Sequence, residues 1–79
     1  MKKRVARKTK FPRLRQLRED LGWEVMDIVA KVAGKPSVAS IYRLEQGQAL
    51  RVSHTRRVFD VINEAHGGKL DAKKELKEE

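Results

Sequence analysis

The stretch Ser37-Val38-Ala39-Ser40-Ile41-Tyr42-Arg43-Leu44-Glu45-Gln46-Gly47 has the pattern of one short helix with a defined start and a defined end. Pro36 cannot lie inside a helix, and Ser37 is a good N-cap because its hydroxyl can accept from a free backbone N–H. Gly47 can adopt the left-handed conformation that closes a helix. Because a helix this short is not stable alone in water, its apolar side must pack against another element.

The two sides of this helix differ in character when residues are placed about 100° apart. One side is apolar apart from one acid, and carries Val38, Ile41, Leu44 and Glu45. The other side is mostly uncharged and carries Ala39, Arg43 and Gln46, with Ser40 and Tyr42 flanking it. Such a side suits a DNA major groove, where an arginine can donate twice to a guanine and small apolar groups can contact thymine methyls. The alternative is an ordinary core helix with a solvated arginine.

Length and composition indicate one small domain without covalent cross-links. The chain has 79 residues and no cysteine, which excludes a disulfide or a thiolate metal site. His54 and His66 have no third ligand apparent, so we predict no metal and no cofactor. No apolar run approaches the roughly 18 residues of a membrane span, and no signal-peptide segment is recognisable. We therefore expect a cytoplasmic protein.

The positive charge is concentrated at the N-terminus. The net charge is +8; residues 1–18 contain nine Lys/Arg and no acid, whereas residues 19–79 contain ten Lys/Arg and eleven acids. We predict that residues 1–10 form a flexible basic arm whose cations are Lys2, Lys3, Arg4, Arg7, Lys8 and Lys10. Such a block is typical of nucleic-acid binding. An anionic membrane surface, or a solubilising tail without a partner, are the alternatives.

Apolar periodicity predicts three further helices, over Pro12–Leu21, over Val25–Ala33 and, with Ser53 as its N-cap, to about His66. No pattern indicates a strand. The predicted fold class is therefore all-α, a compact bundle of four to five helices, with the folded domain over residues 11–67. Residues 68–79 form a charged tail that could be a short fifth helix, a dimer contact or a disordered end.

This order of helices and glycine turns, with its central Ile-x-Arg-Leu-Glu-x-Gly, resembles the lambda-repressor/Cro-like (XRE-type) helix-turn-helix family. The matching residues are Leu14-x-x-Leu17-Arg18-x-x-x-Gly22, Ile28 and Val29, and Ser37-x-x-x-Ile41-Tyr42-Arg43-Leu44-Glu45-Gln46-Gly47. The resemblance implies a helix-turn-helix at the second and third helices, with residues 37–46 as the recognition helix. It also implies a non-enzymatic regulator of transcription, most often a repressor, that binds double-stranded DNA as a homodimer on a palindromic operator. Such a regulator would be associated with the nucleoid and be of bacterial, plasmid or phage type.

The resemblance also assigns individual positions. Base contacts fall on Val38, Ala39 and Arg43, and backbone contacts on Ser37, Gly47 and Gln48. Arg18 and Glu45 match a buried ion pair, and both lie on or beside the apolar side of their helices, where an unpaired charge would be costly. Glu24 and Val25 occupy positions where the family has a polar cap and a polar phosphate contact. We therefore expect further backbone contacts from Lys35, Arg51 and Arg56. At the edge of the helix, Tyr42 could donate to a phosphate or pack on the neighbouring helix, and Ser40 could contact DNA or lie only in the first turn.

Two other functions fit parts of the sequence. The first is an antitoxin-type module that binds a toxin-like protein partner, through residues 69–79, and also represses its own operon. The second is RNA binding through the basic arm, although four aromatic side chains, three of them in apolar patterns, leave little for base stacking. An enzyme is not expected, because no nucleophile–base set and no paired carboxylates on one helix face are present.

Overall fold

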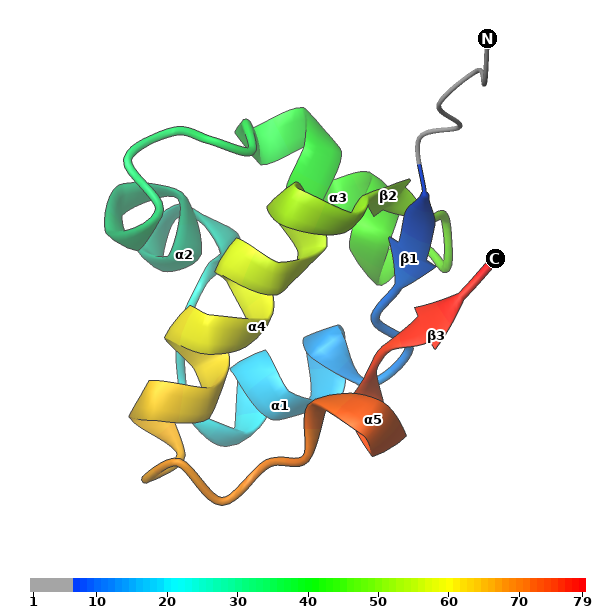
Figure 1. Ribbon diagram of the computed structural model, residues 1–79. Helices are drawn as coiled ribbons and strands as arrows, with labels where there is room; N and C mark the ends of the chain where they lie inside the picture. The colour runs from blue at the N-terminus through cyan, green and yellow to red at the C-terminus, as the bar shows by residue number, and fades with distance from the viewer. Residues whose placement is uncertain (1–6) are drawn as a thin grey trace, which may run out of the picture.

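The computed structural model describes residues 7–79, in which five helices surround one core and a small sheet lies at the end where both termini emerge (Figure 1). The helices are α1 (Leu14–Asp20), α2 (Val25–Lys31), α3 (Val38–Glu45), α4 (Val52–Ala65) and α5 (Ala72–Glu75). The strands are β1 (Lys8–Lys10), β2 (Leu50–Arg51) and β3 (Lys77–Glu78). None of the helices within residues 7–79 combines the length and the hydropathy needed to cross a bilayer.

The core is built from the apolar stripes that the sequence pattern identifies. The buried hydrophobic side chains are Phe11, Leu14, Leu17, Val25, Ile28, Val32, Ile41, Leu44, Val58, Phe59 and Ile62. Phe11 and Phe59 pack at a tilt with their ring centroids 5.7 Å apart, which joins the segment before α1 to α4. Trp23 is half-buried against this core, with the Lys31 ammonium 5.3 Å from its ring centroid.

The starts of α3 and α4 have different physical causes. Ser37 caps α3 as predicted, its hydroxyl accepting from the Ser40 N–H. The expectation that Ser53 is the N-cap of α4 is wrong by two residues, since the helix begins at Val52 and its N-cap is Arg51. No side chain caps α4; instead the Val52 N–H donates to the Arg7 carbonyl at 3.1 Å. The start of α4 is therefore tied to the chain segment that enters β1.

The prediction of an all-α fold is wrong, because the chain also forms a three-stranded antiparallel sheet with the order β2-β1-β3. Lys8 pairs with Arg51, Thr9 with Leu50 and Glu78, and Lys10 with Lys77. Figure 1 shows β1 between the other two strands. These strands are two or three residues long, too short to show the alternation that identifies a strand in sequence.

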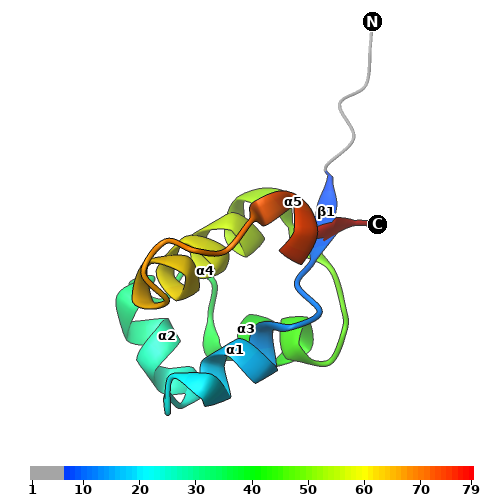
Figure 2. The same cartoon turned by 90° about the horizontal axis from the view of Figure 1, so that it is seen from below.

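The sheet also revises the boundaries of the predicted basic arm and tail. Residues 8–10 of the predicted arm belong to β1, whereas Lys2, Lys3 and Arg4 lie outside the described residues. Residues 68–79 contain both α5 and β3, and Figure 2 shows this segment passing over α4 toward β1. Arg13 forms two hydrogen bonds of 3.0 Å with Glu75, which fix α5 to the start of α1. Leu70 and Leu76 pack against the core.

Two buried threonines at the contact between β1 and α4 give a test of this sheet. The Thr55 hydroxyl donates to the Thr9 carbonyl at 3.0 Å, whereas the buried Thr9 hydroxyl has no hydrogen-bond partner within residues 7–79. Thr55→Val should therefore lower the free energy of unfolding by about 1–2 kcal/mol. Thr9→Val should raise it by about 1 kcal/mol, because it removes an unpaired buried hydroxyl. Urea unfolding of both variants measures this, and changes of the same sign would contradict the packing described.

Candidate nucleic-acid interface

Helix α3 presents one free side to solvent because its opposite side is fixed in the core. Ile41 and Leu44 are fully buried. The exposed side consists of Ala39, Tyr42, Arg43 and Gln46. Arg43 forms no ion pair or side-chain hydrogen bond within residues 7–79, so its five N–H donors are free for a partner. Ala39 and Arg43 thus lie where the sequence places them.

The three other predicted contact positions on α3 differ in how far their side chains are exposed. Val38 is half-buried and packs against the core, so it lies at the edge of the free side and not on it. Tyr42 is 51% exposed and is therefore not committed to packing on a neighbouring helix. Ser40 is half-buried and its hydroxyl is 3.4 Å from that of Ser37, so both serines are engaged in the first turn. Gln46, which the resemblance left out, lies fully on the free side, as the helical spacing indicates.

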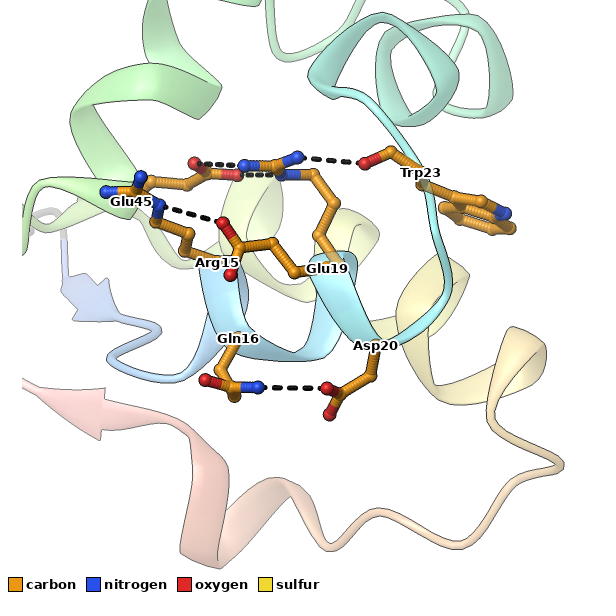
Figure 3. A network of polar contacts seen from close by, with 7 residues as sticks. Arg15, Gln16, Glu19, Asp20, Trp23 and Glu45 are labelled. Carbon is orange, nitrogen blue, oxygen red and sulfur yellow. Dashed lines mark hydrogen bonds and ion pairs between the residues drawn. The ribbon is translucent and has the colours of Figure 1, made fainter.

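The orientation of α3 is fixed by the ion pair that the family resemblance implies and that the two helical patterns support. Arg18 donates to Glu45 through Nε at 2.6 Å and through Nη2 at 3.2 Å, and its Nη1 donates to the Trp23 carbonyl at 2.8 Å. Only 14% of the Arg18 side chain and 7% of the Glu45 side chain are exposed. The hydrogen bonds with Glu45 raise the pKa of the Arg18 guanidinium above its ordinary value, against the lowering effect of burial. Figure 3 shows this network joining α1, α3 and the turn before α2.

Arg57 is a second anchor, and its sequence context gave no sign of this role. From α4 its Nε donates to the Lys35 carbonyl at 2.8 Å and its Nη2 to the Val32 carbonyl at 3.0 Å. These carbonyls belong to the end of α2 and to the turn before α3. Two adjacent positions in this turn, Ala33 and Gly34, have positive φ angles of 57° and 76°. Arg57 therefore holds a turn whose backbone is unusual at Ala33, where a side chain makes that conformation unfavourable.

In the loop after α3, the two backbone amides that the resemblance assigns to phosphate are bonded within the chain. The Gly47 N–H donates to the Leu44 carbonyl at 3.2 Å, and the Gln48 N–H donates to the Arg43 carbonyl at 3.0 Å. Both amides thus close the end of α3, with Gly47 at a φ of 93°. The expected contacts of these two amides with phosphate stay a prediction, and they would compete with these two bonds. The Gln48 side chain remains exposed.

The cations expected to contact phosphate fall into separate places. Lys35 is exposed immediately before the start of α3, and Arg51 is exposed in β2 at the other end of the helix. Lys8 pairs with Arg51 and so lies at the same end. Arg56 instead lines a hollow together with Leu76 and Glu78, because the C-terminal segment folds over that part of α4. The structure therefore brings Lys35, Arg51 and Lys8 to the ends of α3, whereas Arg56 lies in the hollow that the C-terminal segment covers.

Scanning protein-family models, curated proteins and solved structures for similarity to this chain gave no match. Among residues 7–79, no three His, Asp or Glu side chains gather in a way that could hold a metal ion.

The largely buried Arg18–Glu45 pair should contribute far more to the free energy of unfolding than the exposed Arg15–Glu19 pair of α1. Glu45→Ala leaves the Arg18 guanidinium without its partner and should lower the free energy of unfolding by about 3 kcal/mol. The matched control is Glu19→Ala, which breaks the exposed Arg15–Glu19 pair (3.2 Å) and should cost less than about 0.5 kcal/mol. Urea unfolding monitored by circular dichroism measures both losses. Equal losses would show that Arg18 and Glu45 do not fix α3.

Proposed function

We propose that this protein is a sequence-specific double-stranded DNA-binding regulator of transcription, acting as a repressor, with α3 in the major groove. The observation that carries the proposal is the free side of α3, formed by Ala39, Tyr42, Arg43 and Gln46 on a helix whose opposite side is buried. This side is uncharged apart from one arginine. It offers a bidentate donor for guanine, an amide for adenine and a methyl group for contact with thymine.

The rigid attachment of α3 supports this proposal. Side chains that distinguish base pairs must be held in a fixed register, and a helix with eight residues cannot hold itself. Here Arg18 fixes the C-terminal half of α3 through Glu45, and Arg57 fixes the turn that leads into its N-terminal end. Neither anchor bonds to a side chain of the exposed side of α3, which is left free.

The cations at both ends of α3 supply the part of binding that does not depend on sequence. Lys35 precedes the helix, and Arg51 and Lys8 follow it in β2 and β1, so a helix lying in the groove would have positive charge toward the flanking phosphates. Residues 1–6 add three further cations in sequence directly before Arg7. As the family resemblance implies, we propose a homodimer on a palindromic operator, with half-sites about one DNA turn or roughly 34 Å apart.

The antitoxin-type alternative gains no support from the C-terminal segment. The segment uses its apolar side chains Leu70 and Leu76 against the core of its own chain, and β3 pairs with β1. No feature of residues 68–79 thus favours a protein partner.

Arg43→Ala tests the groove assignment. On a duplex selected from a random library, the variant should lose at least about fivefold in its preference over a scrambled duplex, because a bidentate arginine–guanine contact contributes about 1–3 kcal/mol of discrimination. Fluorescence anisotropy titrations on both duplexes measure this ratio.

The matched control is Arg56→Ala, which removes an equal charge from an exposed arginine on α4 instead of α3. It should leave the ratio unchanged. An unchanged ratio in Arg43→Ala would mean that α3 does not contact the bases.

A further inference from the structure

The outer face of the three-stranded sheet collects cations from three distant parts of the sequence. In antiparallel strands, directly paired residues point to the same face, and residues two apart in one strand also share a face. Lys8 pairs with Arg51, Lys10 pairs with Lys77, and Lys8 and Lys10 are two residues apart. These four side chains, Lys8, Lys10, Arg51 and Lys77, therefore share one face, which we call the cationic sheet face.

The opposite face of the sheet is turned toward the protein. Thr9, between the two lysines of β1, is 2% exposed, and its neighbour Leu50 packs against the core. The cationic sheet face must therefore point to solvent. Lys8, Arg51 and Lys77 are exposed and Lys10 is partly exposed.

This arrangement is unfavourable for the sheet alone, because like charges directly opposite each other in an antiparallel pair repel. Both cross-strand pairs on this face are cation with cation. No ion pair within residues 7–79 involves any of the four. The one acid in register on this face is Glu79, whose N–H donates to the Lys8 carbonyl at 3.0 Å. The cationic sheet face thus retains a net positive charge that its own chain does not neutralise.

We propose that the cationic sheet face binds the phosphate backbone of double-stranded DNA beside the stretch that α3 contacts, and that Lys77 of β3 is one of its phosphate ligands. The proposal rests on the proposed function for the identity of the nucleic acid. A row of phosphates matches several cations spread over neighbouring strands, and binding one would relieve the repulsion within the two cross-strand pairs. Residues 46–49 connect α3 directly to β2, and Figure 1 shows β2 beside α3, so the face continues the interface from the end of the helix.

The C-terminal segment thereby acquires a role that its net charge does not suggest. Residues 71–79 contain four acids and three lysines, so a view based on charge alone predicts that they weaken DNA binding. In the structure, β3 instead adds Lys77 to the cationic sheet face and completes the pairing of β1.

Lys77→Gln tests the proposal against a matched control, Lys69→Gln. Lys69 is also exposed, and it lies in the segment between α4 and α5. Figures 1 and 2 show the C-terminal end of α4, where this segment begins, at the end of the molecule away from the sheet. Affinity for a scrambled 20-base-pair duplex is measured by anisotropy between 50 and 300 mM salt. Lys77→Gln should flatten the log–log salt slope by about 0.9 and lower affinity roughly fivefold near 0.15 M salt, whereas Lys69→Gln should resemble the unmodified chain.

A second measurement separates loss of a ligand from loss of structure. Because Lys77→Gln removes the repulsion with Lys10, its midpoint of thermal unfolding at low salt should stay the same or rise while binding falls. Equal salt slopes in the two variants would overturn the proposal. So would retained DNA binding together with lost binding to vesicles of anionic lipid, which would make the face a membrane contact.

Failure of this proposal is distinguishable from failure of the proposed function. The salt slope on a scrambled duplex tests the cationic sheet face alone, whereas base discrimination by α3 is measured by the preference for a selected duplex.

Discussion

The ion pair between Arg18 and Glu45 is the constraint on which the candidate interface depends. It joins α1 to α3 with two hydrogen bonds, and a third bond from the same guanidinium reaches the Trp23 carbonyl in the turn before α2. One arginine therefore fixes three segments whose core contacts are only a few apolar side chains each. Because the pair lies on the inner side of α3, removing either partner would leave a charge in a largely desolvated place and would also release the helix.

Arg57 and the small sheet hold the two ends of α3 in place, as the ion pair holds its inner side. Arg57 donates to two backbone carbonyls at the helix entrance, and β2 follows shortly after the helix exit and pairs with β1. The N-terminal and C-terminal segments of the chain thus meet beside the candidate interface. Pairing in the sheet holds the lysines of both segments next to each other, at a place that neither segment would occupy without the other.

The helices could be predicted from sequence because their signals are local, whereas the pairing of Arg18 with Glu45 followed from the family resemblance and was supported by the place of each charge on its helix. The stripes of Leu14 and Leu17, or of Ile41 and Leu44, repeat with helical spacing, and a charge on an apolar side requires a partner. The sheet could not be predicted, since it depends on pairs such as Thr9 with Glu78 that lie far apart in the chain and have no alternation of their own. The contacts of Arg57, Gly47 and Gln48 were missed for a related reason, because sequence does not show which backbone groups are already satisfied.

The most direct test of the central claim, that α3 contacts base edges in the major groove, is methylation interference. A duplex selected from a random library is methylated sparsely at guanine N7, which lies in the major groove, and at adenine N3, which lies in the minor groove. The account predicts interference at guanine N7 in two half-sites about one turn apart, with loss of one guanine signal per half-site in Arg43→Ala. Interference confined to adenine N3, or none at all, would contradict it.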